Sequence, residues 1–482
     1  MKLNFDNTFA QLGNDFSTAL EAEPFENPSL LHFNEEAAKL LDWPTDEICA
    51  DKLAEFCSGK LPIEGAQPVA TVYAGHQFGG YSEQLGDGRG LLLGEVRNKD
   101  GEKWDLFLKG SGKTPYSRFG DGRAVLRSSI REYLGSEALY YLNIPTTRAL
   151  SLVGSDTPVA REEVETGAML IRLAKSHIRF GHFEYFHYSR TPEQLRTIVD
   201  YAIEQSYPEA KEAKNPYKFF LEAVIERTAN MIALWQSVGF AHGVMNTDNF
   251  TILGDTFDYG PFGFLDDYDP GYICNHSDYE GRYAFRSQPG VGLWNLKAFA
   301  QTLAAFIDVE EIGEALDKYK HLINDKYFSL MLAKVGISTH SEESTDFIVR
   351  TCNLMKKNKC DFTNFFRYLS HYSVDDEQSK LAGEMIDLES FATWKEEYDG
   401  WLAKENDSEQ VRQQKLQVIN PKYIARNYLL QNAIAKAEED DHSEVDKLLQ
   451  ILRKPFDEQP EFEDYAKRSP NWGKGLEISC SS

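Results

Sequence analysis

The spacing of apolar and polar residues changes along the chain, and the change separates a strand-rich part from a helix-rich part. In residues 1–60 the apolar positions follow a helical period, as in Glu35–Leu41. Between residues 68 and 122, short apolar runs stand between glycine-dense turns, a pattern typical of strands. Gly90–Val96 and Trp104–Lys109 are two such runs, and the intervening Asp-Gly pair predicts a hairpin between them.

Beyond this strand-rich stretch the period becomes mainly helical. A helix is predicted over residues 124–142, and a hairpin-like pair of strands at 149–153 and 168–173 follows it. The longest amphipathic stretch is Phe219–Val238, which Gly239 ends because glycine readily adopts the left-handed backbone at a helix C-terminus.

Two segments, residues 243–272 and 279–292, interrupt the helical part. They show little helical period and are rich in Asp, Gly and Asn, as functional loops often are. The tail from Asp375 is again helical and charged, and its acidic run Glu438–Asp441 is interpreted as a solvated face or a linker.

These patterns predict an α+β protein with a β-rich N-lobe and a larger α-helical C-lobe. Helical extensions are expected at both ends of the chain. The predicted parts are an N-terminal helical extension (1–60), the N-lobe (61–180), the C-lobe (181–374) and a C-terminal helical extension (375–482).

Composition and charge narrow the class of protein. The 482 residues include 51 Lys and Arg against 76 Asp and Glu, a formal net charge of −25. A field of that sign repels nucleic acid and anionic membranes, so we expect neither as a partner. No secretory signal and no apolar run of membrane-spanning length is visible, and six scattered cysteines without a CxxC pair fit a reducing cytoplasm.

The candidate chemistry begins at the end of a predicted strand. Gly110-Ser-Gly-Lys-Thr114 suggests a P-loop, but that motif needs a glycine where this chain has Phe107, so the match fails. A strand lysine, Lys109, followed by a helix glutamate, Glu132, fits instead the protein-kinase design in which the glutamate orients a phosphate-binding lysine. A surface lysine is the alternative interpretation of Lys109 alone.

A second cluster of polar residues follows the long helix. In His242-Gly-Val-Met-Asn-Thr-Asp-Asn249, the position of Asn249 is that of a kinase metal ligand, and Asp258 in Asp-Tyr-Gly supplies a second metal oxygen. Hard oxygen ligands suit Mg²⁺, with Mn²⁺ as an alternative. The order of these residues along the chain favours a kinase-like two-lobed fold over a simple surface turn. One position departs from kinases: Val244 replaces the catalytic aspartate, so Asp248 becomes the candidate base.

Cations are concentrated around this predicted cleft. The tetrapeptide Gly-Asp-Gly-Arg occurs twice, at 86–89 and 120–123, where tight turns bring backbone and arginine together. Arg172 and Arg179 lie seven residues apart in a later strand and loop. Surface ion pairs are the alternative interpretation for each arginine taken singly.

Together these segments resemble the selenoprotein O family, also called SelO or YdiU. The resemblance spans most of residues 68–295, and the Cys480 tail matches as well. Five blocks carry it: Tyr73–Gly79 (YAGHQFG), Leu85–Arg89, Lys109–Arg118, Gly120–Glu132 and His242–Asn249. Members of that family are kinase-like protein adenylyltransferases that bind ATP inverted and transfer AMP to Ser, Thr or Tyr hydroxyls, with release of pyrophosphate.

The resemblance implies roles for individual residues. Asp248 would accept the proton, Glu132 would orient Lys109, and Asn249 and Asp258 would hold Mg²⁺. The residues implied to contact ATP are Gly86, Gly88, Arg89, Lys109, Asp121, Gly122, Arg172 and Arg179. Protein substrates are the implied partners, with self-modification as a further expectation.

The family often carries selenocysteine at the position of Cys480. A regulatory disulfide between Cys480 and Cys274 is therefore one hypothesis, and a free tail thiol beside a buried loop thiol is the other. Two functional rivals also stay open. They are a conventional protein or small-molecule kinase and a catalytically silent pseudokinase that binds nucleotide as a scaffold.

Overall fold

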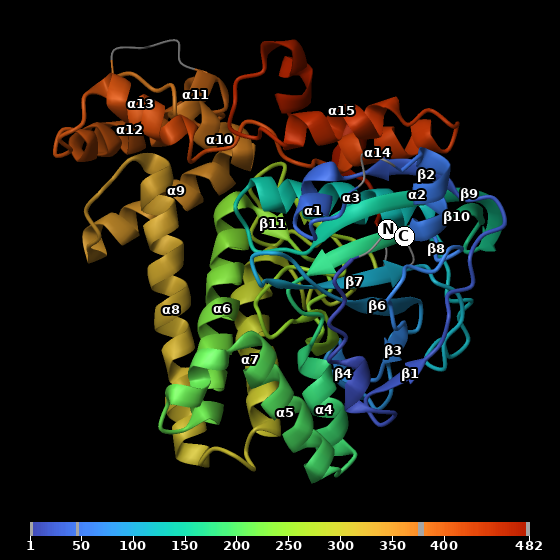
Figure 1. Ribbon diagram of the computed structural model, residues 1–482. Helices are drawn as coiled ribbons and strands as arrows, with labels where there is room; N and C mark the ends of the chain where they lie inside the picture. Colours follow the sequence, from blue (N-terminus) through green and yellow to red (C-terminus); the bar gives the residue numbers. More distant parts are fainter. Residues whose placement is uncertain (1–2, 45–47, 375–379, 479–482) are drawn as a thin grey trace.

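The computed structural model describes residues 3–44, 48–374 and 380–478. Its N-terminal part is built around a twisted antiparallel sheet (Figure 1). The strand order is β1-β3-β6-β7-β10-β9-β2, and β8 pairs with β10. The strands are β1 (Ser17–Ala19), β2 (Ser29–Phe33), β3 (Val69–Thr71), β6 (Gly90–Arg97), β7 (Lys103–Lys109), β8 (Ala124–Val125), β9 (Arg148–Ala160) and β10 (Val164–Ala174). The hairpin predicted between the runs that form β6 and β7 is present, with Gly101 at φ 81° in its turn.

The prediction of a helical segment over residues 1–60 is only partly right. The segment contains α1 (Glu35–Lys39), α2 (Ala50–Cys57) and the short η1 (Ala10–Leu12), but it also supplies β1 and β2. These two strands form the opposite edges of the sheet. Strands of three and five residues are too short to show a period of two, which is why the pattern missed them.

A single long helix, α3 (Leu126–Tyr141), covers one face of this sheet. It lies against β9 and β10 on one side and under the C-terminal helices α14 (Asn427–Ala437) and α15 (Ser443–Leu452) on the other (Figure 1). Being covered on both sides explains why even its polar residues Arg131, Glu132 and Glu137 are buried.

The helical C-lobe follows, with α6 and α8 packed side by side. Gly239 ends α6 at φ 73°, as predicted. The lobe comprises α4 (Phe180–Tyr188), α5 (Pro192–Ser206), η2 (Pro208–Glu212), α6 (Pro216–Val238), η3 (Thr247–Asn249), η4 (Phe285–Ser287), α7 (Gln288–Thr302), α8 (Val309–Val335), α9 (Glu342–Asn358) and α10 (Phe362–Leu369), with the short strands β11 (Phe240–Ala241) and β12 (Gly263–Phe264). Of the two predicted loop segments, 243–272 has no α-helix, whereas the last residues of 279–292 already belong to α7.

The C-terminal region is helical as expected, and its acidic run at 438–441 is exposed. It comprises α11 (Lys380–Gly383), α12 (Leu388–Leu402), α13 (Glu409–Gln417), α14, α15, η5 (Pro460–Ala466) and α16 (Asn471–Lys474). The fold class is therefore confirmed: a β-rich N-terminal sheet precedes a larger helical part in a kinase-like arrangement. Among the described helices, none combines the length and apolar character needed to cross a membrane.

One buried arginine fastens this C-terminal region to the C-lobe. The guanidinium of Arg426 donates to Asp266 Oδ1 at 2.8 Å and to both carboxylate oxygens of Asp361 at 2.8 and 2.9 Å. Arg426 and Asp361 are both fully buried. A buried pair of this kind is costly to break because the remaining charge stays without water or a partner.

We therefore expect Arg426→Ala to lower the free energy of unfolding by about 3–5 kcal/mol, since it leaves the buried carboxylate of Asp361 without its arginine partner. Arg468→Ala is the matched control. Arg468 pairs with Asp267 and Glu384 but is 38% exposed, so its loss should cost no more than about 1 kcal/mol. Urea unfolding of the two variants measures the difference, and equal losses would contradict a special role for Arg426.

Candidate active site

A cavity of about 640 Å³ lies between the sheet and the loops of the helical lobe. Its walls come from the β6–β7 region, the two Gly-Asp-Gly-Arg turns, β10, and the loop that contains η3. The sequence-predicted residues that line it are Gly86, Gly88, Arg89, Lys109, Asp121, Gly122, Arg172, Arg179, Asp248, Asn249 and Asp258. Glu132 is the one predicted residue outside the lining.

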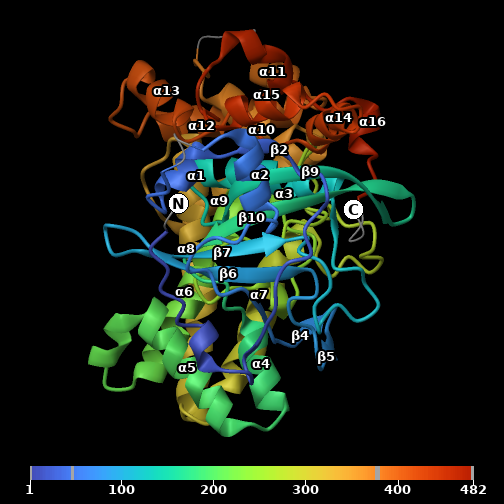
Figure 2. The same ribbon diagram turned by 45° about the vertical axis from the view of Figure 1, so that its right-hand side comes forward.

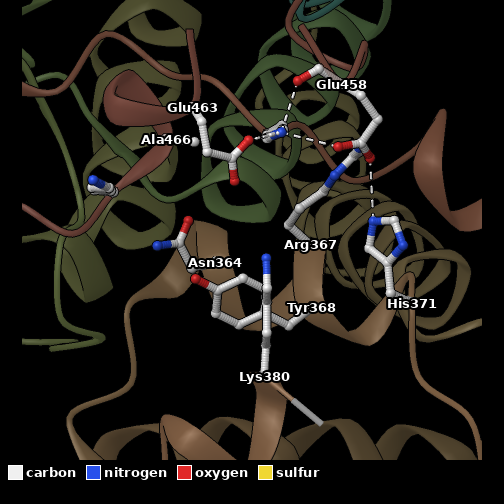
Figure 3. Close-up of a pocket in the computed structure, with 10 residues that line it drawn as sticks. Asn364, Arg367, Tyr368, His371, Lys380, Glu458, Glu463 and Ala466 are labelled. Atoms are coloured by element: carbon white, nitrogen blue, oxygen red, sulfur yellow. Dashed lines mark hydrogen bonds and ion pairs between the residues drawn. The ribbon is translucent and has the colours of Figure 1, made fainter. Parts of the chain in front are cut away.

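A second cavity, of about 320 Å³, lies in the C-terminal region (Figure 3). It also contains cations, and several of them are paired with carboxylates. Lys422 bonds to Glu458 at 2.9 Å and Glu463 at 2.5 Å, and Arg367 pairs with Glu458, which also faces His371. In the cavity between the lobes, by contrast, Arg89 is exposed and has no ion-pair partner among the described residues.

Lys109 and Glu132 form the buried pair that the sequence predicted. Lys109 is the last residue of β7, and its ammonium donates to Glu132 Oε2 on α3. Both side chains are almost fully buried. Burial opposes ionisation of Glu132, but Arg172 and Lys109 outweigh it and lower the pKa of this carboxyl. Glu132 thus lies behind Lys109 and holds it toward the cavity.

Two arginines converge on the carboxylate of Asp258. Arg172, on β10, donates from Nε to Glu132 Oε1 at 2.8 Å and from Nη2 to Asp258 Oδ1 at 2.7 Å. Arg179, which precedes α4, donates to Asp258 Oδ2 at 3.0 Å and to the main-chain oxygen of Asp248 at 3.1 Å. Burial alone would raise the pKa of Asp258, but Arg172, Arg179 and Lys109 outweigh it and hold that pKa far below its usual range.

Asp248 has a different environment from Asp258. Its Oδ2 accepts a hydrogen bond from Gln77 Nε2 at 3.1 Å, whereas its Oδ1 is buried without a hydrogen-bond partner among the described residues. Burial is the main cause that raises the pKa of this carboxyl to about 7. A carboxyl of this kind, in a residue that lines the cavity, is suited to take up a proton.

Asn249 and Asp258, the predicted metal ligands, both line the cavity. The amide nitrogen of Asn249 donates to Val244 O at 3.0 Å, so its amide oxygen is the atom that remains for a metal. Nowhere in the described parts of the chain do three or more His, Cys, Asp or Glu side chains form a metal-binding group. Two oxygen ligands from the protein are what Mg²⁺ ordinarily receives when phosphate oxygens and water complete its shell.

The glycine turns bring the main chain close to the cavity. Gly122 has φ 71°, and a Cβ added there would lie 1.9 Å from Gly112 O, because Gly112 N donates to Gly122 O at 3.0 Å. Gly86 has φ 85°, and an added Cβ would meet the ring of Tyr116 at 2.4 Å. Only glycine fits both the backbone conformation and the space at these two positions.

Several lining residues were not predicted. Gln77 lies in the Tyr73–Gly79 block, which carried the family resemblance but received no role. Arg161, in the β9–β10 turn, pairs with Asp121 at 2.8 Å, and no motif marked it. Arg127 and Arg131 of α3 do not line the cavity: Arg127 pairs with Glu165, and Arg131 donates to Phe262 O at 2.7 Å.

The proposed redox pair can be placed only in part. Cys274 is buried next to the cavity loops, and Cys480 lies outside the described residues. The C-terminal tail does approach this loop, since His276 N donates to the main-chain oxygen of Ile478 at 2.7 Å. The disulfide between Cys274 and Cys480 stays a prediction.

The fold and the cavity together define a kinase-like transferase. A β-rich lobe and a helical lobe enclose a Lys–Glu pair, an Asn–Asp pair on loops and a cluster of arginines. Comparison with known proteins specifies the class further: the chain belongs to the SelO family, because the family model described as protein adenylyltransferase SelO matches residues 1–453. The predicted resemblance and the prediction of a nucleotidyltransferase are thereby confirmed.

Curated relatives agree over the whole chain. A protein nucleotidyltransferase YdiU from Pseudomonas fluorescens (strain SBW25) is 51% identical over 482 residues, covering 100% of this chain and 99% of the relative. Proteins of the same name from Pseudomonas putida (strain GB-1) and Azotobacter vinelandii (strain DJ) are 50% and 49% identical, with the same coverage.

The contact between the two glycine loops gives a testable prediction. Gly122→Ala should lower the free energy of unfolding by about 2 kcal/mol or more, because alanine is strained at positive φ and its Cβ collides with Gly112 O. Gly313→Ala, on the exposed surface of α8 with open space around it, should instead raise stability by about 0.5–1 kcal/mol. Denaturant unfolding measures both, and a neutral Gly122→Ala would contradict this packing.

Proposed function

We propose that this enzyme binds ATP in the cavity between its lobes and transfers AMP to Ser, Thr or Tyr hydroxyls of acceptor proteins. The family supports adenylyl transfer, and ATP is the substrate that this chemistry needs. The observation that carries the proposal is the cluster of three cations at the buried end of the cavity: Lys109 pairs with Glu132, and Arg172 and Arg179 pair with Asp258. Buried cations stabilise the charge of the inner phosphates, which leaves the α-phosphorus toward the acceptor.

The reaction is an in-line displacement at the α-phosphorus. The acceptor hydroxyl oxygen forms a bond to that phosphorus, and the bond from the phosphorus to the oxygen that bridges to the β-phosphate breaks. Pyrophosphate leaves with that bridging oxygen, and the hydroxyl proton passes to the carboxylate of Asp248. Catalysis is then mainly positioning and charge neutralisation.

The remaining residues divide into three roles. Lys109, Arg89, Arg172 and Arg179 hold the phosphates, and Glu132 orients Lys109. Asn249 and Asp258 would hold Mg²⁺, with Mn²⁺ as the alternative, and such a metal would neutralise phosphate charge. The turns that contain Gly86, Gly88, Asp121 and Gly122 bring main chain against the nucleotide. We place the reaction in the cytoplasm, with self-modification as an additional outcome.

A conventional kinase is the main rival, and labelled ATP separates the two reactions. With α-labelled ATP, we expect label on the acceptor protein and on the enzyme itself. With γ-labelled ATP, we expect label only in pyrophosphate, because the β- and γ-phosphates leave together. Acceptor labelled from the γ-position alone would show a kinase. Labelling from neither position would favour a nucleotide-binding scaffold.

Removal of a proposed metal ligand, or of the metal itself, tests the proposed metal site. Asp258→Ala and chelation by EDTA should each abolish AMP transfer, and added Mg²⁺ or Mn²⁺ should restore it only in the chelated wild type. Asp255→Ala is a nearby control, because Asp255 lies outside the cavity lining. Intact-protein mass, which detects the addition of one AMP, is the measurement. Persistence of that mass increase in Asp258→Ala would contradict the assignment.

A further inference from the structure

The hairpin of β4 (Gly75–Gln77) and β5 (Gly80–Ser82) belongs to neither the large sheet nor the helical lobe. It lies below the sheet beside α4, as Figure 2 shows. Its sequence is the Tyr73–Gly79 block, to which the proposed reaction assigns no role. The hairpin nevertheless meets the loop that contains Asp248 and Asn249.

Three consecutive residues of the hairpin contact three consecutive residues of that loop. His76 N donates to Thr247 Oγ1 at 2.7 Å, and Phe78 N donates to Asn246 Oδ1 at 3.2 Å. Between them, Gln77 Nε2 donates to Asp248 Oδ2 at 3.1 Å. The two main-chain bonds fix the position of the hairpin on the loop, and they bring the Gln77 amide to one oxygen of Asp248.

The helical lobe holds both ends of this contact. Glu184 of α4 is fully buried, and its carboxylate accepts from Thr247 Oγ1 at 2.5 Å while its other oxygen lies 2.6 Å from His76 Nδ1. On the other side, Tyr283 OH donates to Asn246 Oδ1 at 2.6 Å. Because each of these side chains has several hydrogen-bond partners at once, the network holds the hairpin and the loop in one relative position.

Gly75 closes the space around the same carboxylate. A Cβ added at Gly75 would lie 2.8 Å from Asp248 Oδ1 and 3.0 Å from Asp248 Cβ, so main chain packs directly against the side chain. The Asp248 side chain, including Oδ1, therefore lies in close contact with the hairpin at Gly75. With Oδ2 held by Gln77, its Oδ1 is the oxygen left without a partner in the described structure.

We propose that residues 75–78 form a clamp on the catalytic loop, in which the Gln77 amide is the positioning residue that orients the Asp248 carboxylate for the acceptor hydroxyl. This deepens the proposed function and rests on it, because it takes Asp248 as the group that accepts the proton. The clamp acts on the orientation of Asp248, whereas the cations proposed to hold the phosphates lie on other segments of the chain.

The first test is a double-mutant cycle with Gln77→Ala and Asp248→Asn, measured as transfer from α-labelled ATP to dephosphorylated casein. Gln77→Ala should lower kcat about 10- to 100-fold, part of the rate that a positioned base contributes, with KM for ATP unchanged. In the Asp248→Asn background the same change should have almost no further effect, because Gln77 acts through Asp248. Equal effects in both backgrounds would overturn the clamp.

A steric variant tests the same carboxylate from the other side. Gly75→Ala should lower kcat about 100-fold by displacing Asp248, since displacements of about 1 Å at a reacting group have effects of that size. Gly80→Ala is the matched control in the same hairpin: its Cβ would lie 3.6 Å from Gln77 O, an ordinary contact. We expect wild-type kcat for Gly80→Ala. The same loss of kcat in both glycine variants would overturn the steric argument.

Hydrogen exchange separates failure of the clamp from failure of the proposed function, because it needs no activity. Peptides that cover residues 242–250 should take up deuterium faster in Gln77→Ala than in wild type or Gly80→Ala. Unchanged uptake would overturn the clamp even where AMP transfer is present. If Gln77→Ala takes up deuterium faster than wild type but the wild-type protein transfers no AMP, the contact of the hairpin with the loop is supported and the proposed function is contradicted.

Discussion

The structure of the active site depends on one buried ionic network. Lys109, Arg172 and Arg179 alternate with Glu132 and Asp258, and the network joins β7, α3, β10, the start of α4 and the loop after η3. Each buried charge is tolerable only because a partner of opposite sign contacts it. The two lobes are therefore held in the relative position that encloses the cavity.

The remainder of the chain supports this network from behind. Glu132 lies on α3, and α3 is buried because α14 and α15 cover the face that the sheet does not. Arg131, next to Glu132, donates to Asn427 of α14 at 3.2 Å, and Arg426 fastens the same helix to Asp361. The C-terminal region thus holds in place the helix whose Glu132 is paired with Lys109.

The net charge of −25 is distributed unevenly over the molecule. Arg89, Arg118 and Arg123 line the same cavity as the buried cations, so positive charge is concentrated where a triphosphate would bind. Around the second cavity, by comparison, Arg367 and Lys422 are both paired with Glu458. This distribution suits a small polyanion with its metal and opposes extended nucleic acid.

The sequence by itself determined the elements and the chemistry carried by local patterns. A kinase-like cleft can be predicted from features that depend on neighbours in the chain. These are the strand period, the Asp100-Gly101 turn, and the order along the chain of Lys109, Glu132, Asn249 and Asp258. The tertiary structure alone decided what distant segments do together: β1 and β2 at opposite sheet edges, Arg161 on Asp121, and Gln77 on Asp248, 171 residues apart. Such contacts leave no period in the sequence, since they are fixed by packing and not by spacing.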